Sequence, residues 1–246
     1  MAHQPICSAL RIWGGHCLDA LLPRHCVLCG LACGSRNICG ACRADLPRAG
    51  HACLSCALPI PDAGDLLCGQ CLRRPPPWDR VVAPLLYAYP VDRLICRFKF
   101  GRDFACGRLL ALEMLDAVRH DAQPLPDMIA PVPLHRARHV FRTFNQADLL
   151  ARLVGRALSI PVHSRLLRRK RRTRAQLGLD AAGRKRNIRG AFQCASHASR
   201  LAVGAHVVLV DDVMTTGATL AECSKTLRRA KVGRVSVWVA ARASVP

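Results

Sequence analysis

The sequence predicts an α/β domain, built on a parallel sheet with helices on both faces, that follows a small metal-bound module. Three observations lead to this fold class. Apolar strand patterns alternate with amphipathic helix patterns from residue 80 onward, which is typical of a parallel sheet covered on both faces. Eleven of the 15 cysteines fall before Leu72. An apolar strand that ends in two acids, Val207–Asp212, is followed closely by a Thr-Gly-Ala-Thr turn.

Length and composition set the first limits. The chain has 246 residues, of which 51% are hydrophobic, which is enough for one domain with an ordinary core and a small additional module. No stretch approaches the roughly 18 consecutive apolar residues of a membrane span. Met1–Leu22 lacks the basic start and clean apolar run of a signal peptide. The sequence therefore predicts a cytoplasmic protein without a membrane span.

The charge is strongly basic, with 37 Lys and Arg against 16 Asp and Glu and a net charge of +21. A solvated basic surface is the plain explanation. An excess this large favours a partner that carries phosphates, either a nucleic acid such as single-stranded DNA or a phosphorylated ligand.

Four segments are expected along the chain. Residues 1–23 contain a helix, and residues 24–72 form a cysteine-rich module with too few apolar residues to fold by burial alone. Residues 73–79, with three consecutive prolines, form a stiff linker. Residues 80–246 form the α/β domain.

Hydrophobic spacing predicts the elements of this domain. Strands are expected at Arg80–Tyr89, Asp127–Pro133, Pro161–Leu166, Ala205–Val210 and Val235–Ala241. Helices are expected at Val91–Phe100, Phe104–His120, Phe144–Leu158 and Gly217–Ala230. Asn145 is the expected N-cap of the third helix, and the basic segment Leu167–Arg189 is expected to be irregular.

Four Cys-x-x-Cys pairs provide eight candidate metal ligands. They are Cys26/Cys29, Cys39/Cys42, Cys53/Cys56 and Cys68/Cys71. Each pair turns two thiolates toward one point, and two pairs complete the four-sulfur shell of a structural zinc site. One pair alone would fit a redox motif, but four pairs in about 46 residues favour zinc. Two structural zinc ions are therefore predicted, with sequential pairing the simplest arrangement and cross-braced pairing still open.

The segment Val207–Leu220 has the chemistry of a ribose phosphate site. Asp211 and Asp212 stand at the carboxyl end of its strand, where open α/β sheets bind ligands, and carboxylates accept hydrogen bonds from vicinal sugar hydroxyls. The following loop offers threonine hydroxyls, a glycine that lets the backbone approach an anion, and the free N–H groups of a helix start. Its residues are Thr215, Thr216, Gly217, Ala218 and Thr219. An ordinary strand–turn–helix is the alternative, and the absence of a Gly-x-x-x-x-Gly-Lys pattern argues against a nucleoside triphosphatase.

This segment resembles the phosphoribosyl pyrophosphate motif of type I phosphoribosyltransferases. The whole chain resembles the ComF/GntX family, whose members join an N-terminal double zinc ribbon to a domain of that fold. The other matching stretches are Cys71–Trp78, Phe98–Phe100, Pro131–Leu134, Phe144–Gln146, Thr173–Gln176 and Arg186-Asn187. Thr143 departs from the family pattern, which usually has glycine before Phe-Asn-Gln.

The resemblance implies roles for individual residues. Asp211 and Asp212 would contact the ribose hydroxyls, the loop from Thr215 to Thr219 the 5-phosphate, and magnesium would accompany phosphoribosyl pyrophosphate. Basic residues in two loops would meet the pyrophosphate and close over the ligand, although a solvated basic turn is the alternative for each. The catalytic residues expected on this basis are Asp211, Asp212, Arg136 and Arg174. Lys99, between two phenylalanines, is a further candidate.

Two functions remain open from the sequence. One is a phosphoribosyltransferase that breaks the anomeric C–O bond of phosphoribosyl pyrophosphate or a related ribose 5-phosphate ligand. The other is a non-catalytic factor that keeps the fold and binds single-stranded DNA, or binds DNA-uptake proteins through the zinc ribbon. The family's association with competence implies DNA uptake or use of external DNA as the setting of both.

Overall fold

The structure is a computed structural model that describes residues 24–61, 64, 66–134, 144–170, 188–195, 200 and 202–244. The helix expected within residues 1–23 lies outside these residues. The chain divides into two compact units, Met1–Leu46 and Pro47–Pro246, and each is described by itself. The division falls between the second and third Cys-x-x-Cys pairs. In the described part of the chain, no helix is both long and apolar enough to cross a membrane.

The first unit is a small cysteine-bearing module. Strand β1 (Arg24–His25) pairs antiparallel with β2 (Ala32–Cys33), and the short helix α2 (Gly40–Ala44) follows. Cys39 is the N-cap of α2, and its sulfur accepts a hydrogen bond from the backbone N–H of Cys42. The chain therefore turns at each of its two cysteine pairs.

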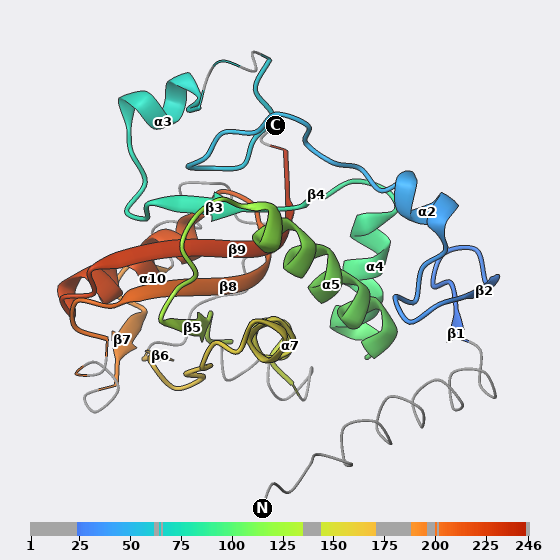
Figure 1. The fold of residues 1–246 in the computed structure, drawn as a ribbon. Coiled ribbons are helices and arrows are strands. Elements are labelled where there is room, and N and C mark those ends of the chain that lie inside the picture. Colours follow the sequence, from blue (N-terminus) through green and yellow to red (C-terminus); the bar gives the residue numbers. More distant parts are fainter. Residues whose placement is uncertain are drawn as a thin grey trace, which may run out of the picture. The chain divides into compact units, whose positions relative to one another are not determined.

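A parallel sheet in the order β3-β9-β8-β5 forms the centre of the second unit (Figure 1). Its strands are β3 (Arg80–Val82), β5 (Met128–Pro131), β8 (His206–Met214) and β9 (Arg234–Arg242), and the short β4 (Leu85–Leu86) also pairs with β9. All of these pairings are parallel. The two central strands are buried over most of their length, as expected for strands covered on both faces. The predicted fold class is confirmed.

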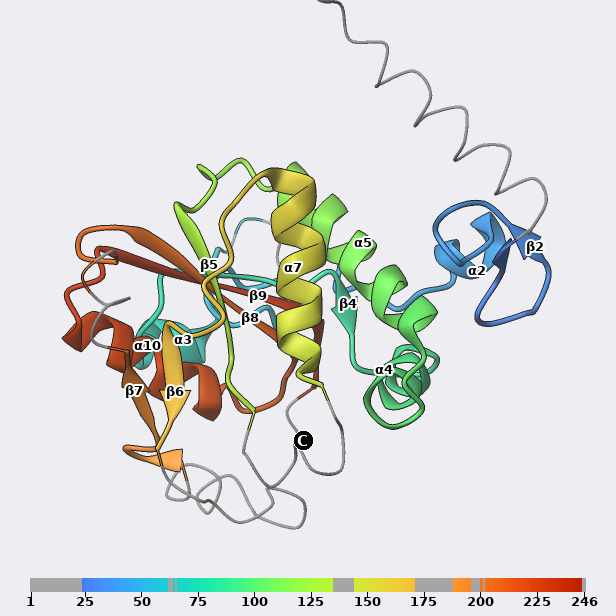
Figure 2. The ribbon, with the colours of Figure 1, turned by 90° about the horizontal axis from the view of Figure 1, so that it is seen from below.

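Helices cover both faces of this sheet (Figure 2). On one face, α5 (Phe104–His120) packs against β3 and β9, α7 (Gln146–Leu158) packs against β5 and β8, and α4 (Val91–Phe100) packs on α5. On the other face lies α10 (Ala218–Arg229), against which β7 of an antiparallel pair packs. That pair consists of β6 (Leu167–Arg169) and β7 (Phe192–Cys194). The connection from β3 through α5 to β5 and the connection from β8 through α10 to β9 run in opposite directions along the sheet, so right-handed crossovers place α5 and α10 on opposite faces.

Three predicted elements differ from the structure. The strand expected over Arg80–Tyr89 is broken into β3 and β4 around Pro84, whose ring has no N–H to donate to a ladder. The strand expected over Pro161–Leu166 is wrong, because Val162 makes only an isolated bridge to Ile129. The basic segment expected to be irregular begins with the strand β6. This strand forms because it pairs with β7, a segment more than 20 residues farther along the chain, so local spacing does not reveal it.

The second cysteine-rich segment is part of the core of the second unit. It begins with the turn between Cys53 and Cys56 and ends in α3 (Gly69–Arg73). Cys53, Cys56 and Cys71 belong to the same buried cluster as Trp78, Leu220 and the inward residues of β8 and β9. This packing gives the segment the apolar partners that it lacks within its own sequence.

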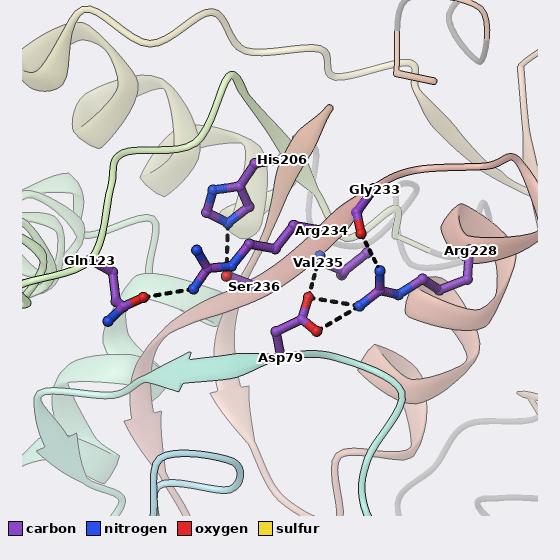
Figure 3. Close-up of polar contacts among 8 residues, drawn as sticks. All are labelled: Asp79, Gln123, His206, Arg228, Gly233, Arg234, Val235 and Ser236. Atoms are coloured by element: carbon purple, nitrogen blue, oxygen red, sulfur yellow. Dashed lines mark hydrogen bonds and ion pairs between the residues drawn. The ribbon is translucent and has the colours of Figure 1, made fainter. Parts of the chain in front are cut away.

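A polar cluster closes the amino ends of the strands (Figure 3). The Arg228 guanidinium of α10 donates to both carboxylate oxygens of Asp79, each at 2.7 Å, and the backbone N–H of Val235 donates to the same carboxylate at 2.8 Å. Arg228 also donates to the carbonyl of Gly233. Asp79 therefore joins the end of the proline-rich segment to α10 and β9.

Protonation of His206 in this cluster is expected to destabilise the fold. Burial, and next Arg234, lower the pKa of His206 below 6.5, while Asp127 and Asp79 oppose the shift. The unfolded chain then binds more protons than the folded one. This contribution to stability is therefore complete above about pH 6.5 and is lost as the pH falls toward the folded pKa.

The variant His206→Gln tests this pH dependence, because glutamine can still bond Ser236, the partner of His206 at 2.8 Å, but does not titrate. We expect it to lose less free energy of unfolding than the wild type between about pH 7.5 and about pH 5.5, measured by urea denaturation. Identical losses in the two proteins would contradict the assignment.

Candidate functional site: the loop before α10 and the four-cysteine clusters

Residues 215–219, the phosphate loop, connect the end of β8 to the start of α10. Gly217 is the N-cap of α10 and has φ 70°, a left-handed conformation that glycine adopts without strain. A Cβ at this position would lie 3.0 Å from Cη2 of Trp78 and 2.8 Å from Cε of Met214. The loop therefore needs glycine here for its backbone conformation and also for space.

The loop presents donors to solvent. Thr215 and Thr216 are exposed, and Thr216 Oγ1 accepts only a long hydrogen bond, 3.4 Å, from the N–H of Ala218. Gly217, the N-cap of α10, has no side chain that could bond to the N–H groups of the first helical turn. Exposed hydroxyls at the start of a helix suit an anion, which the helix dipole also favours.

The two acids lie within β8, which continues past them to Met214 because it stays paired with β9. Asp212 is buried and forms an ion pair with Lys99 of α4, with Nζ and Oδ1 at 2.9 Å. Asp211 instead lies near the Cys223 thiol of α10. Burial raises the pKa of this thiol, and the negative charge of Asp211 raises it further, so Cys223 stays protonated in the core.

The start of α7 holds two neighbouring segments in place. Asn145 caps the helix, as predicted, by accepting from the N–H of Ala147 at 3.1 Å, and its amide donates to the carbonyl of Val132 just after β5. Gln146 is buried and donates to the carbonyl of Lys99 at 3.5 Å. The side chains of Asn145 and Gln146 thus fix the end of β5 and the end of α4 beside Asp212.

The phenylalanines around Lys99 have separate uses. Phe98 is fully buried and packs on Phe144, with ring centroids 5.6 Å apart, so it is part of the core. Phe100 is 69% exposed. Lys99 itself was only a candidate in the sequence, and the fold provides its partner Asp212.

The structure thus joins the acids, the phosphate loop and Lys99 at one edge of the sheet. The expected catalytic residues Arg136 and Arg174 lie outside the described residues, as does Thr143, where the chain departs from the family pattern. Sequence reasoning missed two residues that contact the phosphate loop, namely Trp78, whose ring lies against Gly217, and Arg242, which donates to the carbonyl of Thr215. The available signal was an arginine at the end of an apolar strand, a position where a charged side chain needs buried partners.

The eight cysteines form two groups of four, which settles the pairing as sequential. Cys26, Cys29, Cys39 and Cys42 form the first cluster, and Cys53, Cys56, Cys68 and Cys71 form the second. The sulfurs within each group lie within 4.8 Å of one another. Cys29 and Cys39 are 3.7 Å apart, as are Cys56 and Cys68. A tetrahedral zinc with Zn–S bonds of about 2.3 Å separates its sulfurs by about 3.8 Å. Both clusters therefore fit one zinc ion each, with no place left for a substrate.

The clusters differ in burial. Three ligands of the second cluster are buried, but only Cys26 of the first cluster is. The Trp78 indole N–H donates to the carbonyl of Ser55, within the second cluster's first Cys-x-x-Cys turn, at 2.7 Å. The second cluster is therefore part of the same buried core as the residues beneath the phosphate loop, whereas the first cluster is mostly outside a core.

Comparisons with known proteins agree with this architecture. Residues 17–72 match the model of the double zinc ribbon domain. The chain is 40% identical over 227 residues to the DNA utilization protein YhgH of Escherichia coli K12, which covers 90% of this chain and 98% of that protein. It is 42% identical over 180 residues to competence protein F of Haemophilus influenzae, over 72% of this chain and 78% of that protein.

A solved structure of the glutamine phosphoribosylpyrophosphate amidotransferase from B. subtilis, complexed with ADP and GMP, aligns over 55% of this chain and 26% of that one. The identity is 21% and the TM-score is 0.37, too low for the match to carry weight. The parallel sheet, the two cysteine clusters and the family match define a double zinc ribbon joined to an α/β domain. The chain belongs to the ComF/GntX family.

Proposed function

We propose that the second unit binds a ribose 5-phosphate group, specifically that of phosphoribosyl pyrophosphate with magnesium, and that the protein acts in DNA uptake or use of external DNA. The observation that carries the ligand proposal is the phosphate loop, which leads from the acid-bearing end of β8 through two exposed threonines and Gly217 into the start of α10. The names of the relatives, a DNA utilization protein and a competence protein, support the biological setting.

Each part of the site has a task in this proposal. The hydroxyls and N–H groups of the phosphate loop bind the 5-phosphate, and the carboxylates of Asp211 and Asp212 accept from the ribose hydroxyls. Lys99 holds Asp212 in place before the ligand arrives. Magnesium supplies charge neutralisation of the pyrophosphate. Arg136 and Arg174 are proposed, from the family resemblance, to stabilise the negative charge of the departing pyrophosphate.

Two substitutions test the ligand proposal by calorimetric titration with phosphoribosyl pyrophosphate and magnesium. We expect Asp212→Asn and Thr216→Ala to weaken binding about ten- to a hundredfold, because each removes a hydrogen-bonding group worth about 1.5–3 kcal/mol to a charged or polyhydroxylated ligand. Both variants should stay folded, because Thr216 is exposed and asparagine has the size of aspartate, but Asp212→Asn should lower the unfolding temperature by loss of the ion pair with Lys99.

Asp127→Asn is the matched control, since Asp127 lies at the opposite end of β8, where it accepts from the N–H of His206. Its affinity should equal that of the wild type. If the wild-type protein gives no binding heat and no competition under these conditions, the ligand proposal is wrong.

A second candidate function, single-stranded DNA binding, is favoured by the net charge of +21. Tyr89, just before α4, is 79% exposed and Phe100, the last residue of α4, is 69% exposed. The same helix carries the exposed residues Arg93 and Arg97. Bases stack on such rings while cations contact the phosphates. This function does not require catalysis.

A salt series of single-stranded DNA affinity tests it. We expect log K to fall steeply with log salt, because several phosphate contacts release counterions, and Tyr89→Ala with Phe100→Ala to weaken binding at every salt concentration. Absence of binding even at low salt would exclude this function and leave the zinc ribbons as surfaces for protein partners.

A further inference from the structure

The second cysteine cluster and the phosphate loop share two buried side chains. Arg242, at the end of β9, is 3% exposed. Its Nε donates to the carbonyl of Cys56 at 2.6 Å, and its Nη1 donates to the carbonyls of Met214 at 2.9 Å and Thr215 at 2.5 Å. Nη1 also donates to the carbonyl of Ala243. One guanidinium therefore connects a metal-ligand residue to the first residue of the phosphate loop.

Trp78 makes a second connection. Its indole N–H donates to Ser55, which lies between Cys53 and Cys56. The six-membered part of the same ring lies against Gly217, close enough that a Cβ there would be 3.0 Å from Cη2. The cluster's first Cys-x-x-Cys turn and the N-cap of α10 are thus in contact with opposite parts of one rigid, buried ring.

We propose that Arg242 and Trp78 are positioning residues that couple the order of the phosphate loop to the retention of metal at the second cluster. The carbonyls of Cys56 and Thr215 can share one guanidinium only while the Cys53–Cys56 turn keeps its conformation, and a four-sulfur metal site fixes that conformation. Coupling of this kind is reciprocal, so a disordered loop also loosens the metal site. The first cluster, which belongs to the other compact unit, does not take part.

The proposal does not depend on which ligand the loop binds, so its test uses none. The variants are Arg242→Lys, whose single ammonium replaces a planar fork with several fixed N–H directions, and Trp78→Phe, which keeps an aromatic ring but lacks the N–H that bonds Ser55. The control is Arg80→Lys, which alters another arginine that makes a bidentate pair, with Asp121, but has no contact with either feature. Zinc is saturating during the exchange measurement, and all variants are full-length.

Hydrogen–deuterium exchange is measured for residues 214–221, with residues 207–210 of β8 as the internal reference. We expect exchange in the loop to rise about tenfold in Arg242→Lys and in Trp78→Phe, because each loses a buried hydrogen bond that closes the local structure. The β8 reference and the Arg80→Lys control should not change.

Zinc extraction by a chelator is then followed in a Cys29→Ser background, in which only the second site holds metal. We expect the same two variants to lose this zinc about tenfold faster than the background protein. The proposal is overturned if loop exchange rises without faster zinc loss, if neither changes, or if the β8 reference rises together with the loop. Because no ribose phosphate is present, failure of the ligand proposal would leave these results unaffected.

Discussion

Cys53→Ser is expected to unfold the second unit, whereas Cys29→Ser is expected to remove one zinc and leave that unit folded. Zinc binding contributes about 10–16 kcal/mol of apparent free energy to modules of this kind, and a whole domain is stable by only about 5–15 kcal/mol. The loss is therefore decisive wherever the metal site belongs to the core. Cys53 is 1% exposed and lies in the buried cluster with Trp78 and Leu220.

The first cluster has no such place in the second unit. Cys29 is exposed, and its cluster lies within the separate compact unit Met1–Leu46. Thermal unfolding followed by near-ultraviolet circular dichroism, together with zinc content per chain, distinguishes the two variants. Cys29→Ser should retain one zinc and a cooperative transition, while Cys53→Ser should lose that transition. Equal behaviour of the two variants would show that the clusters contribute alike.

Gly217→Ala is expected to weaken ribose phosphate binding by more than about tenfold, through backbone strain of about 1–2 kcal/mol and a steric effect at the loop. An alanine at φ 70° is strained wherever it occurs, but here its Cβ would also approach Trp78 at 3.0 Å. The Met214 methyl, at 2.8 Å, is the end of a flexible side chain and can turn away. The tryptophan is held by its bond to Ser55, so the loop has to move instead.

Gly204→Ala is the matched control for this effect. Gly204 has φ 74°, and a Cβ there would meet nothing within 4 Å. Both variants should lose unfolding free energy in urea through the strained φ, Gly217→Ala more than Gly204→Ala because of its steric clash, but only Gly217→Ala should lose affinity in the calorimetric titration. Unchanged affinity in Gly217→Ala would mean that the ligand does not depend on the geometry of this loop.

Local spacing allowed much of this architecture to be predicted. Helices α4, α5, α7 and α10 lie where their hydrophobic periodicity and caps placed them, because those signals act within a few turns of chain. The predictions for the short elements were wrong because these elements depend on contacts with distant parts of the chain. β6 has only three residues, two of them arginine, and it is a strand because Phe192–Cys194 pairs with it.

The sequence by itself determined the eight candidate zinc ligands, since two thiolates three residues apart already converge on one point. It also placed a Thr-Gly turn directly after a strand that ends in two acids. Only the tertiary structure decided what surrounds them. It paired Lys99 with Asp212, assigned the cysteine pairs to separate clusters, and brought Arg242 and Trp78 between the second cluster and the phosphate loop. These contacts join residues that are distant in the chain, and strand register and packing bring them together.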